Sequence, residues 1–258
     1  MTARWDCHVH AFGPAYPASP DRGYDPPLVT AAECVAEAKE AGFDRVVWVQ
    51  PSAFGMDNTA QLDALDAFAQ TSRAVIAPPP QGADLAALHR RGVRGLRVNL
   101  LSAGGNATAT IAPHERAMAD LGWHVAAFLD ATTTTALDEL LAATTRPIVL
   151  DHFAGASSAA DPRAFDAVLR HMAGGRVWVK LSAVYRLGPV PPDAMATLVR
   201  RFVEARADRL LFASNWPHVQ QPPGHTTRAL AGEMAGWITQ AGLDPERIFA
   251  DNPSVLYA

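Results

Sequence analysis

The sequence predicts a single α/β domain over residues 1–258, folded as a distorted (β/α)₈ TIM barrel. The first observation is an alternation of short apolar runs, rich in β-branched and aromatic residues, with amphipathic stretches rich in Ala and Leu. Such apolar runs are typical of parallel strands buried on both faces. The second observation is that polar residues follow most of these runs, as at the carboxyl end of a barrel. An open doubly wound sheet is the alternative, but no G-x-G-x-x-G motif follows the first strand.

The expected strands are short and apolar: Trp5–Val9, Arg45–Gln50, Ala74–Ala77, Val93–Val98, Trp123–Leu129, Pro147–Leu150, Val177–Leu181 and Leu210–Ala213. The expected helices follow them in turn: Ala31–Ala41, Thr59–Gln70, Ala83–Arg91, Pro113–Leu121, Thr134–Ala143, Pro162–Met172, Pro192–Ala205 and Thr227–Ala241. Gly42, Gly92, Gly122 and Gly175 stand just after helices, where glycine readily adopts the left-handed conformation that ends a helix. About eight strand–helix units in about 250 residues match a closed barrel.

Composition and charge exclude several classes of function. The chain has 22 Lys and Arg residues against 26 Asp and Glu, a net charge of −4, whereas a nucleic-acid-binding protein needs a basic face. Its two cysteines, Cys7 and Cys34, are too few for a disulfide scaffold. The N-terminus lacks the apolar core of a signal peptide, and no apolar run is long enough to span a membrane. We therefore expect a cytoplasmic protein with a small-molecule partner and no nucleic-acid or membrane partner; the oligomeric state stays open.

Three histidines stand where predicted strands end. His8 and His10 are two residues apart in the first strand, so both side chains point to the same face, the interior or mouth of the barrel. His152 follows the sixth strand. Buried imidazoles are costly unless they bind a metal, a charge or a substrate. We therefore expect the three histidines to meet in one functional cavity.

Other polar residues at the strand ends have more than one interpretation. Asp151, beside His152, either orients a neighbour or packs outside the barrel. Lys180 is either a lysine that snorkels to solvent or a buried cation with a lowered pKa. Arg97 is the better candidate for binding an anion, because its planar guanidinium can donate two hydrogen bonds to a carboxylate. His124 opens the fifth strand, so we expect it to pack near the floor or middle of the barrel.

These residues belong to motifs that follow one another along the chain. The motifs are Asp6–Pro14, Gly92–Leu100, Leu121–His124, Leu150–Phe153, Trp178–Ser182, Asp208–His218 and Asp251–Pro253. Together they resemble the amidohydrolase superfamily, specifically the branch that contains 2-pyrone-4,6-dicarboxylate lactonase. The resemblance runs almost end to end, and it implies a distorted (β/α)₈ barrel that hydrolyses a small organic acid, usually a lactone.

The resemblance also implies roles for single residues. His8, His10 and His152 match the histidines that polarise the lactone carbonyl. Asn215 matches an aspartate that accepts a proton from the attacking water, which an amide cannot do at neutral pH. Either another group activates water (His218, or His10 acting as base), or the chemistry differs, or the chain is inactive. This branch is metal-independent, whereas other members of the superfamily bind divalent ions, such as Zn²⁺ or Mn²⁺, through the same histidines.

The ligand is a further point of difference. The dicarboxylate-binding members place several arginines around the pocket, of which Arg97 and Arg186 match. The loops that would supply the others contain no arginine, so we expect a less anionic ligand, such as a monocarboxylated lactone. Tyr24 and Tyr185 either add phenol contacts to this ligand or pack on the rim.

The sequence therefore predicts a hydrolase that opens the ester C–O bond of a small carboxylated lactone, in aromatic-acid or sugar-acid catabolism. Its expected catalytic residues are His8, His10, His152 and Asn215, and its expected ligand-binding residues are Tyr24, Arg97, Lys180, Tyr185, Arg186 and His218. No cofactor is required in this interpretation. Two alternatives stay open: a metal-dependent decarboxylase or C–N amidohydrolase, with the ion on His8, His10 and His152, and a barrel that only binds a small acid because of Asn215.

Overall fold

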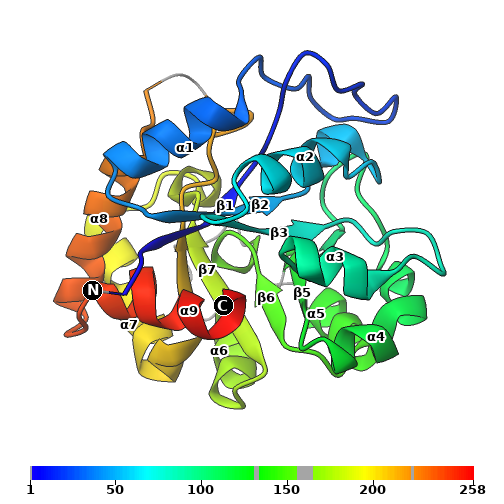
Figure 1. The fold of residues 1–258 in the computed structure, drawn as a ribbon. Helices are drawn as coiled ribbons and strands as arrows, with labels where there is room; N and C mark the ends of the chain where they lie inside the picture. Colours follow the sequence, from blue (N-terminus) through cyan, green and yellow to red (C-terminus); the bar gives the residue numbers. More distant parts are fainter. Residues whose placement is uncertain (1, 131–133, 156–164, 222–223) are drawn as a thin grey trace.

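The computed structural model describes residues 2–130, 134–155, 165–221 and 224–258, and it confirms the predicted barrel (Figure 1). Eight strands form one sheet in chain order, and each neighbouring pair from β1 to β8 is parallel. They are β1 Trp5–Val9, β2 Arg45–Val49, β3 Ser72–Ile76, β4 Val93–Asn99, β5 His124–Phe128, β6 Ile148–Leu150, β7 Val177–Ser182 and β8 Leu210–Ala213. The largest difference from prediction is in β3, which starts at Ser72 rather than Ala74 because Ser72 pairs with Val46.

The barrel closes just after its last strand rather than along it. β8 stops at Ala213, and the residues that follow bond to β1. The Asn215 amide donates to the His8 carbonyl at 2.9 Å, and the His10 amide donates to the Trp216 carbonyl at 3.1 Å. The seam of the barrel therefore lies at the residues that were predicted to be catalytic.

A β-bulge in β1 sets the direction of the side chains at this seam. Residues 6–9 of β1 oppose only residues 46–48 of β2, so β1 has one extra residue there. An extra residue breaks the strict alternation of side chains. Cys7 packs in the inner apolar cluster, and the next residue, His8, also faces inward, where its ring contacts Lys180.

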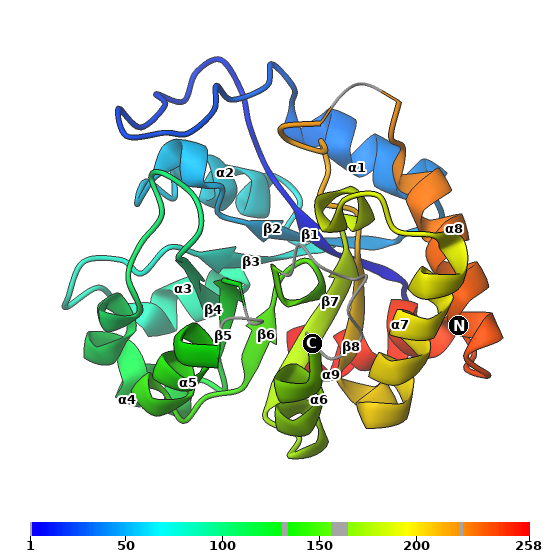
Figure 2. The ribbon, with the colours of Figure 1, turned by 180° about the vertical axis from the view of Figure 1, so that it is seen from behind.

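Eight helices that follow the strands surround the sheet (Figure 2). They are α1 Ala31–Glu40, α2 Thr59–Ala67, α3 Leu85–Arg91, α4 Glu115–Asp120, α5 Thr134–Ala143, α6 Asp166–Ala173, α7 Pro192–Arg206 and α8 Thr227–Gln240. The Thr30 side chain caps α1 in a capping box with Glu33. Asp84 accepts from the Ala87 amide, so α3 starts at Leu85 rather than at the predicted Ala83.

Two other helix boundaries differ from prediction. The predicted helix 113–121 is wrong at its start, because residues 108–114 form a 3₁₀ turn with Pro113 inside it. The predicted helix 59–70 is wrong at its end, because Phe68 leaves helical geometry at φ −123°. Residues 162–164 of the predicted helix 162–172 lie outside the described residues.

The C-terminal segment closes the floor of the barrel, which the sequence did not predict. A π-helical turn, η7 (Arg247–Asp251), leads into α9 (Asn252–Tyr257). Tyr257 is fully buried; its ring stacks on Trp5 at 5.8 Å and meets the edge of His124 at 5.4 Å, between centroids. This helix lies at the end opposite to the long loop between β1 and α1 (Figure 1). His124 lies near the floor, as expected.

The apolar interior has two main layers. An outer cluster packs the helices against the sheet, and an inner cluster fills the lower part of the barrel. The inner cluster contains Trp5, Cys7, Val47, Val49, Val75, Ala126, Val149, Trp178, Leu211, Ala213 and Tyr257. Within the described parts of the chain, no helix combines the length and the apolar character needed to cross a bilayer.

Candidate active site

The junction of β1 and β8 places an amide beside two imidazoles. The backbone bonds across the seam hold Asn215, whose φ is 63°, next to His8 and His10. Asp6 braces this junction, because its Oδ1 accepts from the amides of Ser214 at 2.9 Å and His8 at 3.3 Å. Burial raises the pKa of this carboxyl to about 6. The seam thus brings together three of the predicted catalytic residues.

The third histidine comes from the end of β6. The centroid of the His8 ring lies 4.9 Å from that of His10 and 4.7 Å from that of His152. All three side chains are buried, with at most 3% of their surface exposed. His152 has a left-handed φ of 52°, at the point where the chain leaves the strand. Three imidazoles from distant parts of the sequence therefore form one cluster.

A buried carboxylate next to the cluster holds two cations. Asp151 Oδ1 lies 2.9 Å from Lys180 Nζ, and Asp151 Oδ2 lies 3.2 Å from an Arg97 terminal nitrogen. His8 Nδ1 lies 3.2 Å from Asp151 Oδ1 and 3.2 Å from Lys180 Nζ. Burial acts to raise the pKa of Asp151, but Lys180, then His8 and Arg97, outweigh it and hold the pKa well below its ordinary value. We call Asp151, Lys180, Arg97 and His8 the charge network.

The charge network decides two of the open interpretations. Lys180 is buried, with 0% of its surface exposed, so the expectation that it could snorkel to solvent is wrong. Asp151 orients its neighbours, and the expectation that it could pack outside the barrel is wrong. Val149 faces the inner cluster, and the alternation of side chains two residues later turns Asp151 inward as well.

His10 is held in one tautomer. Its Nδ1 lies 2.8 Å from the Val49 carbonyl, which can only accept, so Nδ1 carries the proton. Burial, and then the charge of Arg97, lowers the pKa of His10 to about 3, so the ring is neutral at pH 7. A neutral ring that is protonated on Nδ1 has its lone pair on Nε2. The contact of Nδ1 with the Val49 carbonyl therefore makes Nε2 of His10 a hydrogen-bond acceptor.

His8 and His152 can adopt the opposite tautomer. The Ser182 hydroxyl lies 2.8 Å from His152 Nδ1 and can donate to it. This contact leaves the proton of His152 on Nε2. His8 Nδ1 lies 3.2 Å from both Lys180 Nζ, which can donate to it, and Asp151 Oδ1, which can only accept from it, so these contacts allow either tautomer of His8. Burial lowers the pKa of both imidazoles well below the ordinary value, so both are neutral. His152 lines the pocket and can donate toward a ligand there, whereas His10 accepts; His8 lies behind them.

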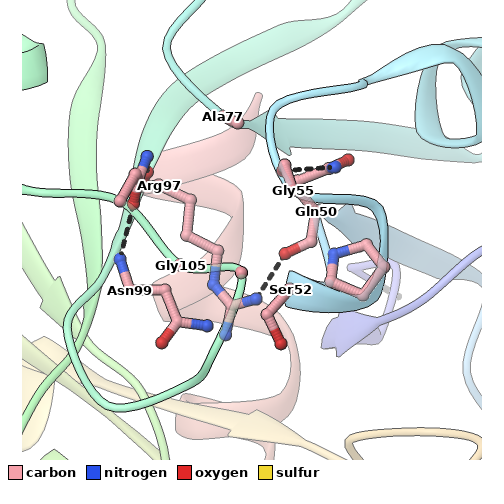
Figure 3. Close-up of a pocket in the computed structure, with 10 residues that line it drawn as sticks. Gln50, Ser52, Gly55, Ala77, Arg97, Asn99 and Gly105 are labelled. Carbon is pink, nitrogen blue, oxygen red and sulfur yellow. Dashed lines mark hydrogen bonds between the residues drawn. The ribbon is translucent and has the colours of Figure 1, made fainter. Parts of the chain in front are cut away.

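A small pocket opens beside this cluster; the space between its atoms, open solvent included, is about 280 Å³. It is lined by His10, Tyr24, Pro51, Ser52, Arg97, Asn99, Ser102, Phe128, His152, Arg186, Asn215, Val219 and Gln220. Six of the predicted site residues belong to this set. A neighbouring cavity of about 210 Å³ shares Pro51, Ser52, Arg97 and Asn99 with it (Figure 3). Arg97 therefore lines both of two neighbouring cavities.

The two arginines of the pocket differ in how much of the guanidinium is free. Arg97 uses one terminal nitrogen on the Gln50 carbonyl (Figure 3) and the other on Asp151. Arg186 stacks over the Phe128 ring at 5.6 Å. The buried Nε of both arginines has no hydrogen-bond partner in the described part of the chain, so the two differ at their terminal nitrogens. Arg186 is thus the guanidinium that is available to a carboxylate of the ligand.

The remaining predicted residues lie outside the pocket lining. Asn215 Nδ2 donates to the Tyr185 hydroxyl at 2.9 Å, so Tyr185 orients the amide. His218 packs edge-on against Tyr185 at 6.2 Å, and its ring nitrogens have no partner among the residues described. His8 and Lys180 belong to the charge network. Tyr24, in contrast, lines the pocket directly.

Sequence reasoning missed two residues that position this site. Ser182 contacts His152, and its position two residues after Lys180 on the same strand face was a usable signal. Asp6 braces the seam through Ser214, a contact that no local pattern reveals. Both residues act by holding a backbone or a ring in place.

Known proteins match this chain over almost its whole length. The amidohydrolase family model matches residues 5–258. The chain is 30% identical to 2-pyrone-4,6-dicarboxylate hydrolase of Comamonas testosteroni, over 98% of this chain and 89% of that protein. It is also 30% identical to 4-sulfomuconolactone hydrolase of Rhizobium radiobacter, over 83% of this chain and 75% of that protein.

Solved structures share the fold. A probable 2-pyrone-4,6-dicarboxylic acid hydrolase from Acinetobacter baumannii, with citric acid bound, has a TM-score of 0.85 at 24% identity, over 100% of this chain and 99% of that one. An amidohydrolase from Burkholderia multivorans with bound zinc has a TM-score of 0.67 at 20% identity, over 99% of this chain and 96% of that one. At these identities, the likeness concerns the barrel alone.

The zinc-bound relative makes the fit of a metal a relevant test. The three imidazoles are the available metal ligands. Position 215 carries an amide, which is a poorer metal ligand than a carboxylate. Lys180 and Arg97 already place two positive charges next to the imidazoles. Over residues 2–130, 134–155, 165–221 and 224–258, no three His, Cys, Asp or Glu side chains have the arrangement of a metal site. These residues do not fit a divalent ion.

Proposed function

The chain belongs to the amidohydrolase family, and from that premise we propose that it hydrolyses the ester bond of a small carboxylated lactone, in aromatic-acid or sugar-acid catabolism. The observation that carries the proposal is a cluster of neutral imidazoles beside a pocket that contains an unpaired guanidinium. Two lactone hydrolases match most of the chain, which supports the same substrate class.

The first task of the site is to polarise the lactone carbonyl. His8 and His152 donate from Nε2 toward the carbonyl oxygen, which becomes an oxyanion when water adds to the carbon. Donors aimed at this developing charge stabilise the transition state more than the substrate. Lys180 and Asp151 have a positioning role, because both contact His8 Nδ1 at 3.2 Å and hold the ring in place.

The second task is to hold the acid group of the substrate. Arg186 has free donors beside the pocket, whereas Arg97 uses both terminal nitrogens on protein groups. One free guanidinium binds one carboxylate in bidentate geometry. We therefore favour a monocarboxylated lactone as substrate, with Tyr24 as a further contact.

The reaction is proposed to need no metal or other cofactor. The support is the positive charge of Lys180 and Arg97 beside the imidazoles, together with the amide at position 215. Two alternatives to this metal-independent hydrolysis are catalysis by a bound ion and a barrel that binds an acid without turnover.

Steady-state assays of the purified chain with matched mono- and dicarboxylated lactones test the proposal. We expect turnover that survives chelation, with the higher kcat/KM for the monocarboxylated lactone. The Arg186→Met variant is expected to raise KM for that lactone but not for an uncharged lactone of the same ring size. A preference for the dicarboxylated lactone would overturn the single-carboxylate assignment. Activity that chelation abolishes and Zn²⁺ or Mn²⁺ restores would favour the metal-dependent alternative, and binding without turnover of any lactone would favour the acid-binding barrel.

A further inference from the structure

The pocket lacks the usual group for activating water. Among the described residues that line it, none is an aspartate or a glutamate. Asp151 is the nearest carboxylate of the cluster, but it is engaged by Lys180, Arg97 and His8 and has no exposed surface. Asn215 cannot take a proton. Hydrolysis in this site therefore needs another proton acceptor.

Asn215 instead offers an oriented hydrogen-bond acceptor. Its Nδ2 donates to the Tyr185 hydroxyl, which directs the amide group, and its buried Oδ1 has no partner within the described part of the chain. Asn215 is fully buried but lines the pocket, and its side chain also acts on the pKa of the His10 ring, so a water molecule that enters between the two groups would meet this oxygen. Such a water would donate one hydrogen to Oδ1 and keep the other for a base.

His10 also lines the pocket, and it has a ring nitrogen that can accept a proton. The Val49 carbonyl fixes its proton on Nδ1, so the free Nε2 can only accept, and His10 lines the same pocket as Asn215. We propose that His10 Nε2 is the general base of this enzyme, and that Asn215 Oδ1 orients the water that His10 deprotonates. This inference rests on the proposed lactone hydrolysis, and it separates His10 from the two histidines that polarise the carbonyl.

The proton balance needs no further reactant. The oxygen of water bonds to the carbonyl carbon while one of its protons moves to His10 Nε2. The bond between this carbon and the ring oxygen then breaks, and the ring oxygen takes the proton from Nε2. The products are a hydroxyl group and a carboxylic acid that ionises into solvent, and His10 returns to its starting tautomer.

A double-mutant cycle distinguishes this role from a structural one. His10→Asn keeps an amide donor for Val49 but removes Nε2, so kcat is expected to fall by about 10²–10⁴-fold, the usual contribution of a general base. Asn215→Asp supplies a carboxylate base, and in that background we expect the loss from His10→Asn to shrink to about 10-fold or less, because the two sites are coupled. An equal loss in both backgrounds would overturn the proposal.

A second buried histidine serves as the matched control. His114 Nε2 also contacts a backbone carbonyl, that of Pro79, at 2.9 Å, but His114 lines neither cavity of the site. We expect His114→Gln to leave kcat unchanged. If only Asn215→Asp variants hydrolyse lactones, His10 is not a competent base; if no variant does, the proposed function itself fails.

The tautomer can also be measured without any substrate. Long-range ¹H–¹⁵N NMR spectra distinguish protonated from unprotonated ring nitrogens, and His10→Asn identifies the signals by their loss. We expect a protonated Nδ1 and an unprotonated Nε2 for His10 at pH 7. A proton on Nε2 would overturn the proposal even if the variants are inactive.

Discussion

A histidine is buried at each end of the barrel interior, His10 at the mouth and His124 at the floor. Burial lowers the pKa of both rings to about 3. His124 packs against Tyr257, and neither of its ring nitrogens has a hydrogen-bond partner among the residues described. His10 donates to Val49 and presents its second nitrogen to a pocket. The shifted pKa is therefore common to both rings, whereas of the two only His10 combines a fixed tautomer with a place beside a pocket.

The surroundings of the two ends differ in the same way. The floor is apolar, with Trp5 and Tyr257 stacked across it. The mouth holds the charge network, in which Asp151 is shared by Lys180 and Arg97. Burying two charges costs desolvation free energy that can exceed what their pairing returns. Stability alone therefore does not account for the charge network. Its presence at the mouth is consistent with a role in orienting His8.

The largest effect is expected from removing the charge at the centre of the network. Asp151→Asn leaves Lys180 and Arg97 without a counterion, so we expect a loss of about 3–5 kcal/mol in the free energy of unfolding and a strong loss of kcat. Urea unfolding and steady-state kinetics measure both. The exposed pair of Asp66 and Arg91, at 2.8 Å, is the control, and Asp66→Asn should cost about 1 kcal/mol or less. If the two variants lose the same free energy of unfolding, the charge network contributes no more to stability than an exposed ion pair does.

The second effect concerns the two histidines that polarise the carbonyl. We expect His8→Ala and His152→Ala each to lower kcat by about 10²–10³-fold, the usual cost of losing one oxyanion donor. His124→Ala at the floor should reduce stability by leaving a cavity, but kcat should stay near that of the parent chain. Near-normal kcat in both mouth variants, at substrate saturation, would contradict the proposed role.

The third effect is a dependence of stability on pH, to which both ends contribute. The unfolded chain protonates His10 and His124 below pH 6.5, but the folded chain does so only near pH 3, so stability falls as the pH falls through this range. Within this range, each ring changes the free energy of unfolding by about 1.4 kcal/mol per pH unit. Asp6 opposes this trend between pH 6 and 3.8, because burial raises its folded pKa to about 6.

Urea unfolding at several pH values from 7 to 4 measures this dependence. His124→Gln removes one of the groups, so the slope of the unfolding free energy against pH should decrease by about 1.4 kcal/mol per unit. A slope that does not change in the variant would show that the floor histidine is not kept neutral by burial.

The fold class and the strands could be predicted because their signals are local. A strand such as β8 (210–213) is an apolar run that is buried on both faces wherever it sits in the barrel. The histidine pair was visible for the same reason, since a spacing of two in a strand gives a common face. The helix starting at Leu85 was misplaced by two residues because a cap side chain, Asp84, decides the first turn.

The sequence by itself determined the barrel and its polar end, because burial and strand periodicity act over a few residues. The change of residue at Asn215 came instead from the resemblance of the sequence to the amidohydrolases. Only the tertiary structure decided that Tyr257 closes the floor, that Asp151 faces Lys180, and that the Val49 carbonyl sets the tautomer of His10. Each of these contacts joins residues that are far apart in the chain, and the geometry of the closed barrel determines which of them meet. The identity of a side chain is a property of the sequence, but the position of its proton depends on its neighbours in space.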